Sequence, residues 1–285
     1  MSSLLNFLTP YEFSPLVLVA CAGSVALYFI GLRRMRSVGE AVNGWRTASF
    51  LIGVGSIYAV MQTHIDYYSQ HMFWIHRAQH LVLHHVGAFL VVLAVPQPII
   101  ARALPAPLMN KVLVPLWRHP LVRIPYRTVQ YPAVAAILFV GLIFFWLTPS
   151  IHFAAMLSAS RYELMNLSMV VDGLLFWWLV VDPRPKEQGG MGYGARIIMV
   201  WAIMFPQIVL GAYISLSSGI LYDVYSICGR AWPLSPIVDQ QVGGLITWIP
   251  SSMMSVVGML LVLRMWRRDN ARASDAQSAA VAAAS

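Results

Sequence analysis

The chain has 285 residues, of which 59% are hydrophobic and only 11% are charged, whereas soluble domains carry about 25% charged residues. This composition excludes an ordinary soluble domain and predicts a membrane protein. The net charge of +8 is explained by topology signals and by attraction to anionic lipid, so we expect the lipid bilayer as a partner and no nucleic acid.

Apolar runs long enough to cross a membrane recur along the chain. A spanning helix needs about 20 mostly apolar residues, and such runs lie near residues 14–32, 45–63, 78–98, 130–148, 163–181, 196–217 and 242–264. The alternating pattern of a membrane β-barrel is absent from the sequence. We therefore predict an all-α, polytopic membrane protein, a bundle of about seven transmembrane helices that forms one domain over residues 1–268.

Basic residues collect after every odd-numbered predicted helix, where the positive-inside rule places the cytoplasm. They are Arg33, Arg34, Arg36, Arg102, Lys111, Arg118, Arg123, Arg127, Arg184, Lys186, Arg264, Arg267 and Arg268. This distribution predicts an N-terminus outside and a cytoplasmic C-terminus. The segment before the first helix lacks the basic region of a cleavable signal peptide, so we expect that helix to be retained. Residues 269–285 are rich in small side chains and predict a disordered tail.

Histidines gather on the predicted outer side of the membrane. They are His64, His71, His76, His80, His84, His85 and His152, whereas His119 alone falls on the cytoplasmic side. If the third helix begins near Ile75, the first three histidines of that helix recur every four residues on one face. Two histidines at this spacing can bind one metal ion, as in helical zinc sites.

A structural role for these histidines is the alternative to a metal site. A lone membrane histidine is commonly a structural hydrogen-bonding group, but burying several imidazoles without partners costs free energy, so the cluster favours a shared metal or haem. His85 points away from the others and could meet Asp172 in the fifth helix. Cys21 and Cys228 form no spaced motif, which argues against a thiolate site.

Methionines near the histidines add a weaker indication. They are Met61, Met72, Met165, Met169, Met253 and Met254. Thioether and imidazole ligands together suit Cu(I). Methionine is also ordinary filler in apolar cores, so ligation by these side chains stays one of two interpretations.

The stretch "SPIVDQQVGGLITWIPSSMM", residues 235–254, precedes and enters the last predicted helix. Asp239 is expected to cap this helix, because a carboxylate there satisfies free backbone N–H groups and complements the helix dipole. Capping does not account for Gln240 and Gln241. Gly243 and Gly244 would let a neighbouring helix or a bound group approach the backbone closely.

Together these stretches resemble the CtaG-like assembly factors of caa3-type cytochrome c oxidase. "HRAQH" carries the family's arrangement at His76, Gln79 and His80, and the aspartate, glutamine and glycine pattern before the last helix matches, with Trp248 and Pro250 following. "GLLFWW" and "WRHP" are lesser matches. The resemblance implies a protein of the bacterial plasma membrane that matures a haem-copper oxidase, through copper delivery.

The chain departs from this family in the fifth helix, where relatives carry further histidines and this sequence reads "YELMNLSMVVDG". A ligand from that helix would have to be Met165, Asn166, Met169 or Asp172.

Residues and resemblance together predict an outer-facing site that holds copper, favoured as Cu(I), and passes it to an oxidase subunit by ligand exchange, with no reaction catalysed. His76 and His80 are the first candidate ligands, and His84, His71 and His152 are further ones. Supporting roles fall to Gln79, Asp239, Gln240, Gln241 and Asp172. The alternatives are a haem-binding membrane oxidoreductase, a transporter of copper or protons, and a metal-free scaffold for oxidase assembly.

Overall fold

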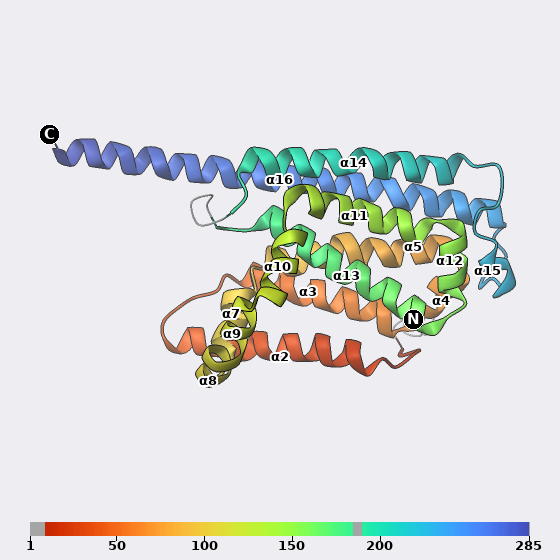
Figure 1. The fold of residues 1–285 in the computed structure, drawn as a ribbon, viewed down its shortest axis with the longest axis horizontal. Helices are drawn as coiled ribbons and strands as arrows, with labels where there is room; N and C mark the ends of the chain where they lie inside the picture. The colour runs from red at the N-terminus through yellow and green to blue at the C-terminus, as the bar shows by residue number, and fades with distance from the viewer. Residues whose placement is uncertain (1–8, 185–189, 285) are drawn as a thin grey trace.

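The computed structural model, which describes residues 9–184 and 190–284, is a bundle of long helices (Figure 1). These are α2 (Pro15–Ser37), α3 (Gly44–Gln62), α11 (Pro132–Leu147), α13 (Ala159–Val181), α14 (Tyr193–Leu216) and α16 (Pro236–Ala284). Another is built from α5 (Phe73–Leu81), a π-helical turn η1 (Val82–Val86) and α6 (Gly87–Leu93). Within the described ranges no strand forms, and one isolated bridge joins Pro10 to Thr63. The all-α prediction is confirmed.

Membrane crossing is supported for fewer helices than predicted. By length and hydropathy, four helices of the described residues could cross a membrane, namely α2, α13, α14 and α16 up to Ala279. The number rises to six if two bent pairs are single spans: Phe73–Leu93 with α7 (Gln97–Ala103), bent by 68°, and α10 (Pro120–Val129) with α11, bent by 75°. The membrane character is thus supported, whereas the count of seven is not confirmed.

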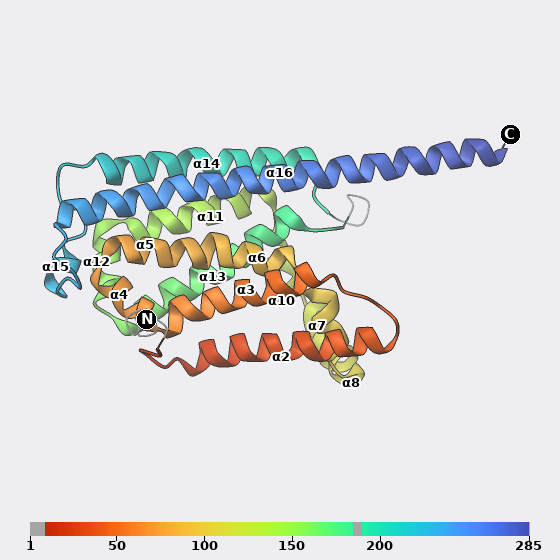
Figure 2. The same cartoon turned by 180° about the vertical axis from the view of Figure 1, so that it is seen from behind.

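Short helices close the two ends of the bundle (Figure 2). One end carries α4 (His64–His71), α12 (Pro149–Met156) and α15 (Val224–Ile227), and we call it the histidine end. The other carries α7, α8 (Ala106–Leu108), η2 (Met109–Leu113), α9 (Val114–Arg118) and α10. These last helices hold five of the predicted cytoplasmic basic residues, and Lys186 lies outside the described residues. The direction in which the bundle crosses the membrane stays a prediction.

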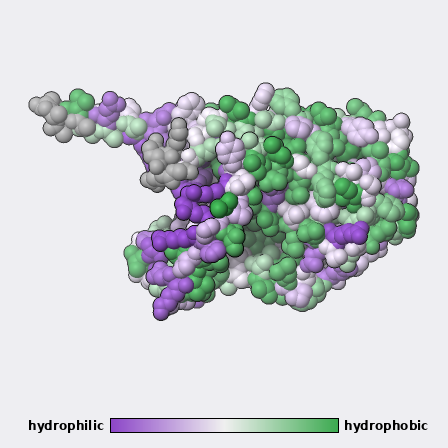
Figure 3. All heavy atoms as spheres, viewed as in Figure 1, coloured by the Kyte–Doolittle hydropathy of each residue, from purple (hydrophilic) through white to green (hydrophobic). Residues whose placement is uncertain are grey.

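The surface agrees with a lipid-embedded body. Figure 3 shows hydrophobic residues over much of the side of the bundle, and hydrophilic residues around the short helices α7–α10 and at the base of the projecting part of α16. Large apolar side chains such as Ile137, Val209 and Leu216 are exposed. Lipid tails would cover such side chains at no cost in free energy.

The C-terminal tail differs from its prediction. Instead of a disordered segment over residues 269–285, α16 continues as a helix to Ala284 and projects beyond the bundle (Figures 1 and 2), while Ser285 lies outside the described residues. The side chains of residues 271–279 are exposed, so no packing holds this part. Alanine has the highest helix propensity, and extending an existing helix needs no new nucleus.

The π-helical turn determines how the histidine-bearing helix meets α13. A π turn includes one more residue per hydrogen bond than an α-helix, which leaves a backbone carbonyl to be satisfied elsewhere. The carbonyl of His84 accepts a hydrogen bond from the indole N–H of Trp177 at 3.1 Å. Gly173 lies against the same backbone, and a Cβ there would be 2.6 Å from the His84 oxygen. The helices α13 and η1 therefore touch at their backbones.

This contact gives a prediction about stability. Gly173→Ala should lower the unfolding free energy by about 1–3 kcal/mol, because the added methyl overpacks against backbone that cannot move aside. Gly141→Ala in α11 is the matched control, since apart from its own stretch of helix no atom of the described residues lies within 4 Å of its new Cβ and alanine favours the helix. Thermal unfolding in detergent compares the two. Equal stability of both variants would contradict the close contact.

Candidate metal site

The last helix positions the helix that carries the histidines. The carboxylate of Asp239 accepts hydrogen bonds from the backbone N–H groups of Phe73 at 3.0 Å and Trp74 at 2.8 Å, and it pairs with Arg230 at 2.5 Å. The prediction that Asp239 caps its own helix is therefore wrong. Its side chain lies in the first turn of α16, is completely buried, and faces the free N–H groups at the start of α5. Asp239 thus holds α5 three residues before His76.

His76 and His80 form a buried pair on α5. Both side chains are fully buried, and their ring centroids lie 4.3 Å apart. Neither ring nitrogen of His76 has a partner at normal hydrogen-bond distance and angle among the described residues, although the backbone of Ser69 lies near the ring. In His80, Nε2 bonds Asn166 Oδ1 at 3.0 Å, while Nδ1 has no described partner. With the amide oxygen accepting, His80 carries its proton on Nε2 and presents a bare lone pair on Nδ1.

His152 stands next to this pair but is tied to other groups. Its ring, on α12, meets that of His76 edge to face at a centroid distance of 5.0 Å. Nδ1 donates to the Trp146 carbonyl at 3.0 Å, and Nε2 bonds the Tyr225 hydroxyl at 2.9 Å. Burial lowers the pKa of His152 to about 3, so the ring is neutral at physiological pH. It can bind a metal ion only by giving up the hydroxyl of Tyr225.

His84 and His85 belong to a second group deeper in the bundle. Nε2 of His84 bonds the Asp172 carboxylate at 2.8 Å, and its ring stacks on Phe139, whereas His85 bonds Gln207 at 3.1 Å. The predicted contact of His85 with Asp172 is wrong, because the π turn changes the direction of both side chains. Among the described residues, ring contacts join His84 to His85 but not to His80.

His71 also lies apart from the pair. It ends α4, its Nδ1 bonds the Tyr67 carbonyl at 2.7 Å, and its ring lies against that of Tyr67. The structure thus brings together three of the five predicted ligands. Across residues 9–184 and 190–284, no group of three or more His, Cys, Asp or Glu side chains is arranged to hold a metal ion. What the described residues offer is a pair of imidazoles with three unpaired ring nitrogens, and a third imidazole beside it.

The fifth predicted helix, α13, supplies partners for histidines. Asn166 bonds His80 and Asp172 bonds His84. Met165 and Met169 are buried members of the apolar core, the ordinary role of this side chain. An outer partner that fixes the tautomer and orientation of a ligating imidazole is typical of metal sites. Asn166 gives His80 this kind of support.

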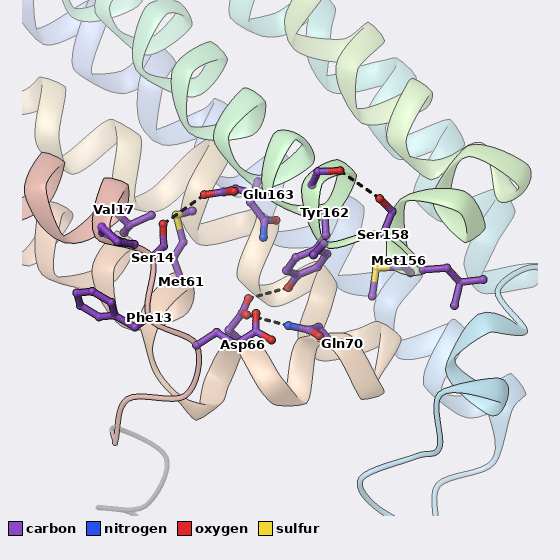
Figure 4. A pocket seen from close by; sticks show the side chains of 16 residues that line it. Phe13, Ser14, Val17, Met61, Asp66, Gln70, Met156, Ser158, Tyr162 and Glu163 are labelled. Atoms are coloured by element: carbon purple, nitrogen blue, oxygen red, sulfur yellow. Dashed lines mark hydrogen bonds between the residues drawn. The ribbon is translucent and has the colours of Figure 1, made fainter.

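Gln79 belongs to a polar network that sequence reasoning missed. Its amide donates to Asp66 at 2.7 Å. The hydroxyl of Tyr162 donates to the same carboxylate oxygen at 2.7 Å, a contact that Figure 4 shows. Burial raises the pKa of Asp66 to about 6, against the effect of these hydrogen bonds and one from Gln70. The sequence signal that could have revealed this network is Asp66 itself, a single acidic residue between apolar helices. The network joins α4, α5 and α13 around the pair.

The remaining predicted supports fix the backbone. Gln240 accepts from the Leu221 N–H at 2.6 Å and donates to the Gly219 carbonyl at 3.0 Å, which anchors the loop before α15. The side chain of Gln241 is exposed. A Cβ on Gly243 would meet the ring of Phe73, and one on Gly244 would meet Ser215 and Gly211. The predicted close approach of other helices to these two glycines is confirmed.

Arg77 is a further residue that the sequence did not single out. Its side chain is buried beside the pair, and its Nε donates to the Thr247 hydroxyl at 3.0 Å. None of the ion pairs among the described residues includes it. A fixed positive charge without a carboxylate partner repels a cation bound nearby. The site therefore combines free imidazoles with a charge that opposes tight cation binding.

Comparison with known proteins places the chain among assembly factors. A family model described as cytochrome c oxidase caa3 assembly factor matches residues 26–269. Uncharacterized proteins of Mycobacterium leprae (26% identical), Mycobacterium bovis (28%) and Mycobacterium tuberculosis (28%) match over 114 residues, 39% of this chain. The chain spans only 17% of the length of these curated relatives. No solved structure gives a significant match.

The shifted pKa of Asp66 predicts a pH dependence of stability. Between pH 3.8 and about 6 the native chain keeps a proton that the unfolded chain has lost, so the unfolding free energy falls as pH rises through this window, by about 3 kcal/mol in total. Asp66→Asn should flatten this fall, and Asp223→Asn, an exposed acid, should not. Thermal unfolding in detergent from acid to neutral pH measures it, and parallel curves for wild type and Asp66→Asn would contradict it.

Proposed function

The chain belongs to the cytochrome c oxidase caa3 assembly factors, and from that premise we propose that it carries copper, as Cu(I), for the maturation of a haem-copper terminal oxidase. The His76–His80 pair would hold the ion, and an oxidase subunit would receive it. The proposed location is a bacterial plasma membrane, with the histidine end facing the outer compartment.

One observation carries this proposal: the fully buried imidazoles of His76 and His80 have three ring nitrogens without a described hydrogen-bond partner. Buried polar groups are normally paired, and each unpaired one costs free energy. A metal ion that bridges the rings would remove this cost for the lone pairs. Imidazole is a common copper ligand, and two neutral rings bring no negative charge into the bundle.

The surroundings of the pair suit an ion that must leave again. His152 would add a third ligand when Tyr225 releases it, and the hydroxyl of Tyr225 has an alternative acceptor in the sulfur of Met156 at 3.9 Å. The charge of Arg77 weakens the hold on the cation. Transfer is then an exchange of ligands between this chain and its partner, and we propose no catalysed reaction.

The geometry does not favour the haem alternative. Axial histidines stand on opposite faces of a haem, but the rings of His76 and His152 touch edge to face, and His76 with His80 extend from successive turns of one helix. A macrocycle could enter between these rings only if the helices separated.

The proposal predicts copper binding that depends on the pair. Purified chain incubated with Cu(I) and desalted should retain about one ion per molecule, measured by mass spectrometry of the metal. The double variant His76→Leu with His80→Leu should lose it. His119→Asn is the matched control, because His119 is exposed and caps α10 at the opposite end through Nδ1, a role asparagine keeps.

The same variants separate a metal site from structural histidines. His76→Leu should fold at least as stably as wild type without copper, because it removes two unpaired buried nitrogens. Wild-type protein that retains no copper would overturn the proposal and favour a metal-free scaffold, whereas a double variant with full copper would overturn the assignment of the site to the His76–His80 pair. A haem absorption band in the blue region would instead support the oxidoreductase.

A further inference from the structure

The histidine end is hollowed by an open pocket with a volume of about 680 Å³. It lies between the start of α2, α4, α12 and the start of α13 (Figure 4). Its chemistry contrasts with the basic chain around it. Three carboxylates line the pocket, those of Glu12, Asp66 and Glu163, and none of its described lining residues is a lysine or an arginine.

Two thioethers line the same space. Figure 4 shows Met61 next to Glu163 on one side of the pocket, Met156 on the other, and Asp66 with Tyr162 between them. Carboxylates raise the local concentration of cations, and thioethers bind soft ions such as Cu(I). A pocket that offers both, on a protein of net charge +8, suits a soft cation rather than an anion or an apolar ligand.

A thin wall separates this pocket from the unpaired imidazoles. Tyr162 and Asn166, one turn apart on α13, both line the pocket. On the other side, Asn166 bonds His80 at 3.0 Å, and the ring centroid of Tyr162 lies 6.1 Å from that of His76. The buried pair, with its unpaired nitrogens, points independently to a ligand and lies directly behind these two side chains.

We infer that this pocket is the route by which Cu(I) reaches and leaves the His76–His80 pair, with Tyr162 and Asn166 as the barrier between them. The inference rests on the proposed function. Tyr162 is held in place by hydrogen bonds to Asp66 and Ser69, so the last step requires these bonds to open. Glu163, exposed and bonded only to Ser14 among the described residues, is free to attract the incoming ion.

The test is the rate of copper transfer into the full-length purified chain, followed by loss of colour from a chromogenic Cu(I) chelator after rapid mixing. Glu163→Gln and Met61→Leu remove a charge and a thioether from the pocket. Ser160→Trp places a bulky ring at an exposed lining position. Asp223→Asn is the control, an equal change of charge at an exposed residue of the histidine end outside the pocket lining.

We expect the pocket variants to slow uptake by about two- to tenfold, and the effect of Glu163→Gln to shrink at high salt. Final copper per chain should stay at the wild-type value, because a route changes uptake and release together. Asp223→Asn should match wild type. Thermal unfolding of each variant confirms that it is folded.

Three results would contradict the inference, and they are distinguishable. If wild type takes up copper and all pocket variants take it up at the wild-type rate, the route is overturned and the proposed function stands. Reduced final copper in Glu163→Gln would make Glu163 a ligand and overturn the route as stated. No copper uptake by wild type would refute the proposed function and the route together.

Discussion

A carboxylate from the last helix holds the beginning of the helix that carries the histidines, and the site depends on this contact. Asp239 satisfies two backbone N–H groups at the start of α5 and is itself neutralised by Arg230. A buried carboxylate without these partners would be strongly unfavourable. The Asp239 carboxylate, Arg230 and the N–H groups at the start of α5 therefore fix one another's positions. They also fix the position of His76 along the bundle. Gly243 completes the contact by letting the ring of Phe73 lie against the α16 backbone.

The π-helical turn is the second constraint, because it divides the histidines of one helix into two groups. Before it, His76 and His80 face α12 and the start of α13. Within it, His84 and His85 bond Asp172 and Gln207. His80, His84 and His85 each have one bonded and one unpaired ring nitrogen, whereas both ring nitrogens of His76 are unpaired among the described residues. Within this helix, His76 is thus the histidine without a described hydrogen-bond partner on either ring nitrogen.

How much the sequence could predict follows from the range of each interaction. Apolar runs locate the long helices, and the spacing of His76 and His80 predicts their pairing, because both depend on neighbours along the chain. The partner of Asp239 could not be predicted, since it lies more than 160 residues away. The network of Asp66 with Tyr162 joins separate helices in the same way. The π turn leaves no mark on hydropathy, so His84 was wrongly grouped with the pair, and the tail was interpreted by its small-residue, low-complexity composition rather than by the helix propensity of its alanines.

The unpaired nitrogens of His76 have a consequence for the lifetime of the protein. If the pair binds copper as proposed, their cost falls on the empty chain alone, and filling the site is thermodynamically linked to folding. Under that proposal, a copy without its ion would unfold more readily and meet proteases sooner. Supply of the ion would then regulate the abundance of its own carrier, with no separate sensor involved.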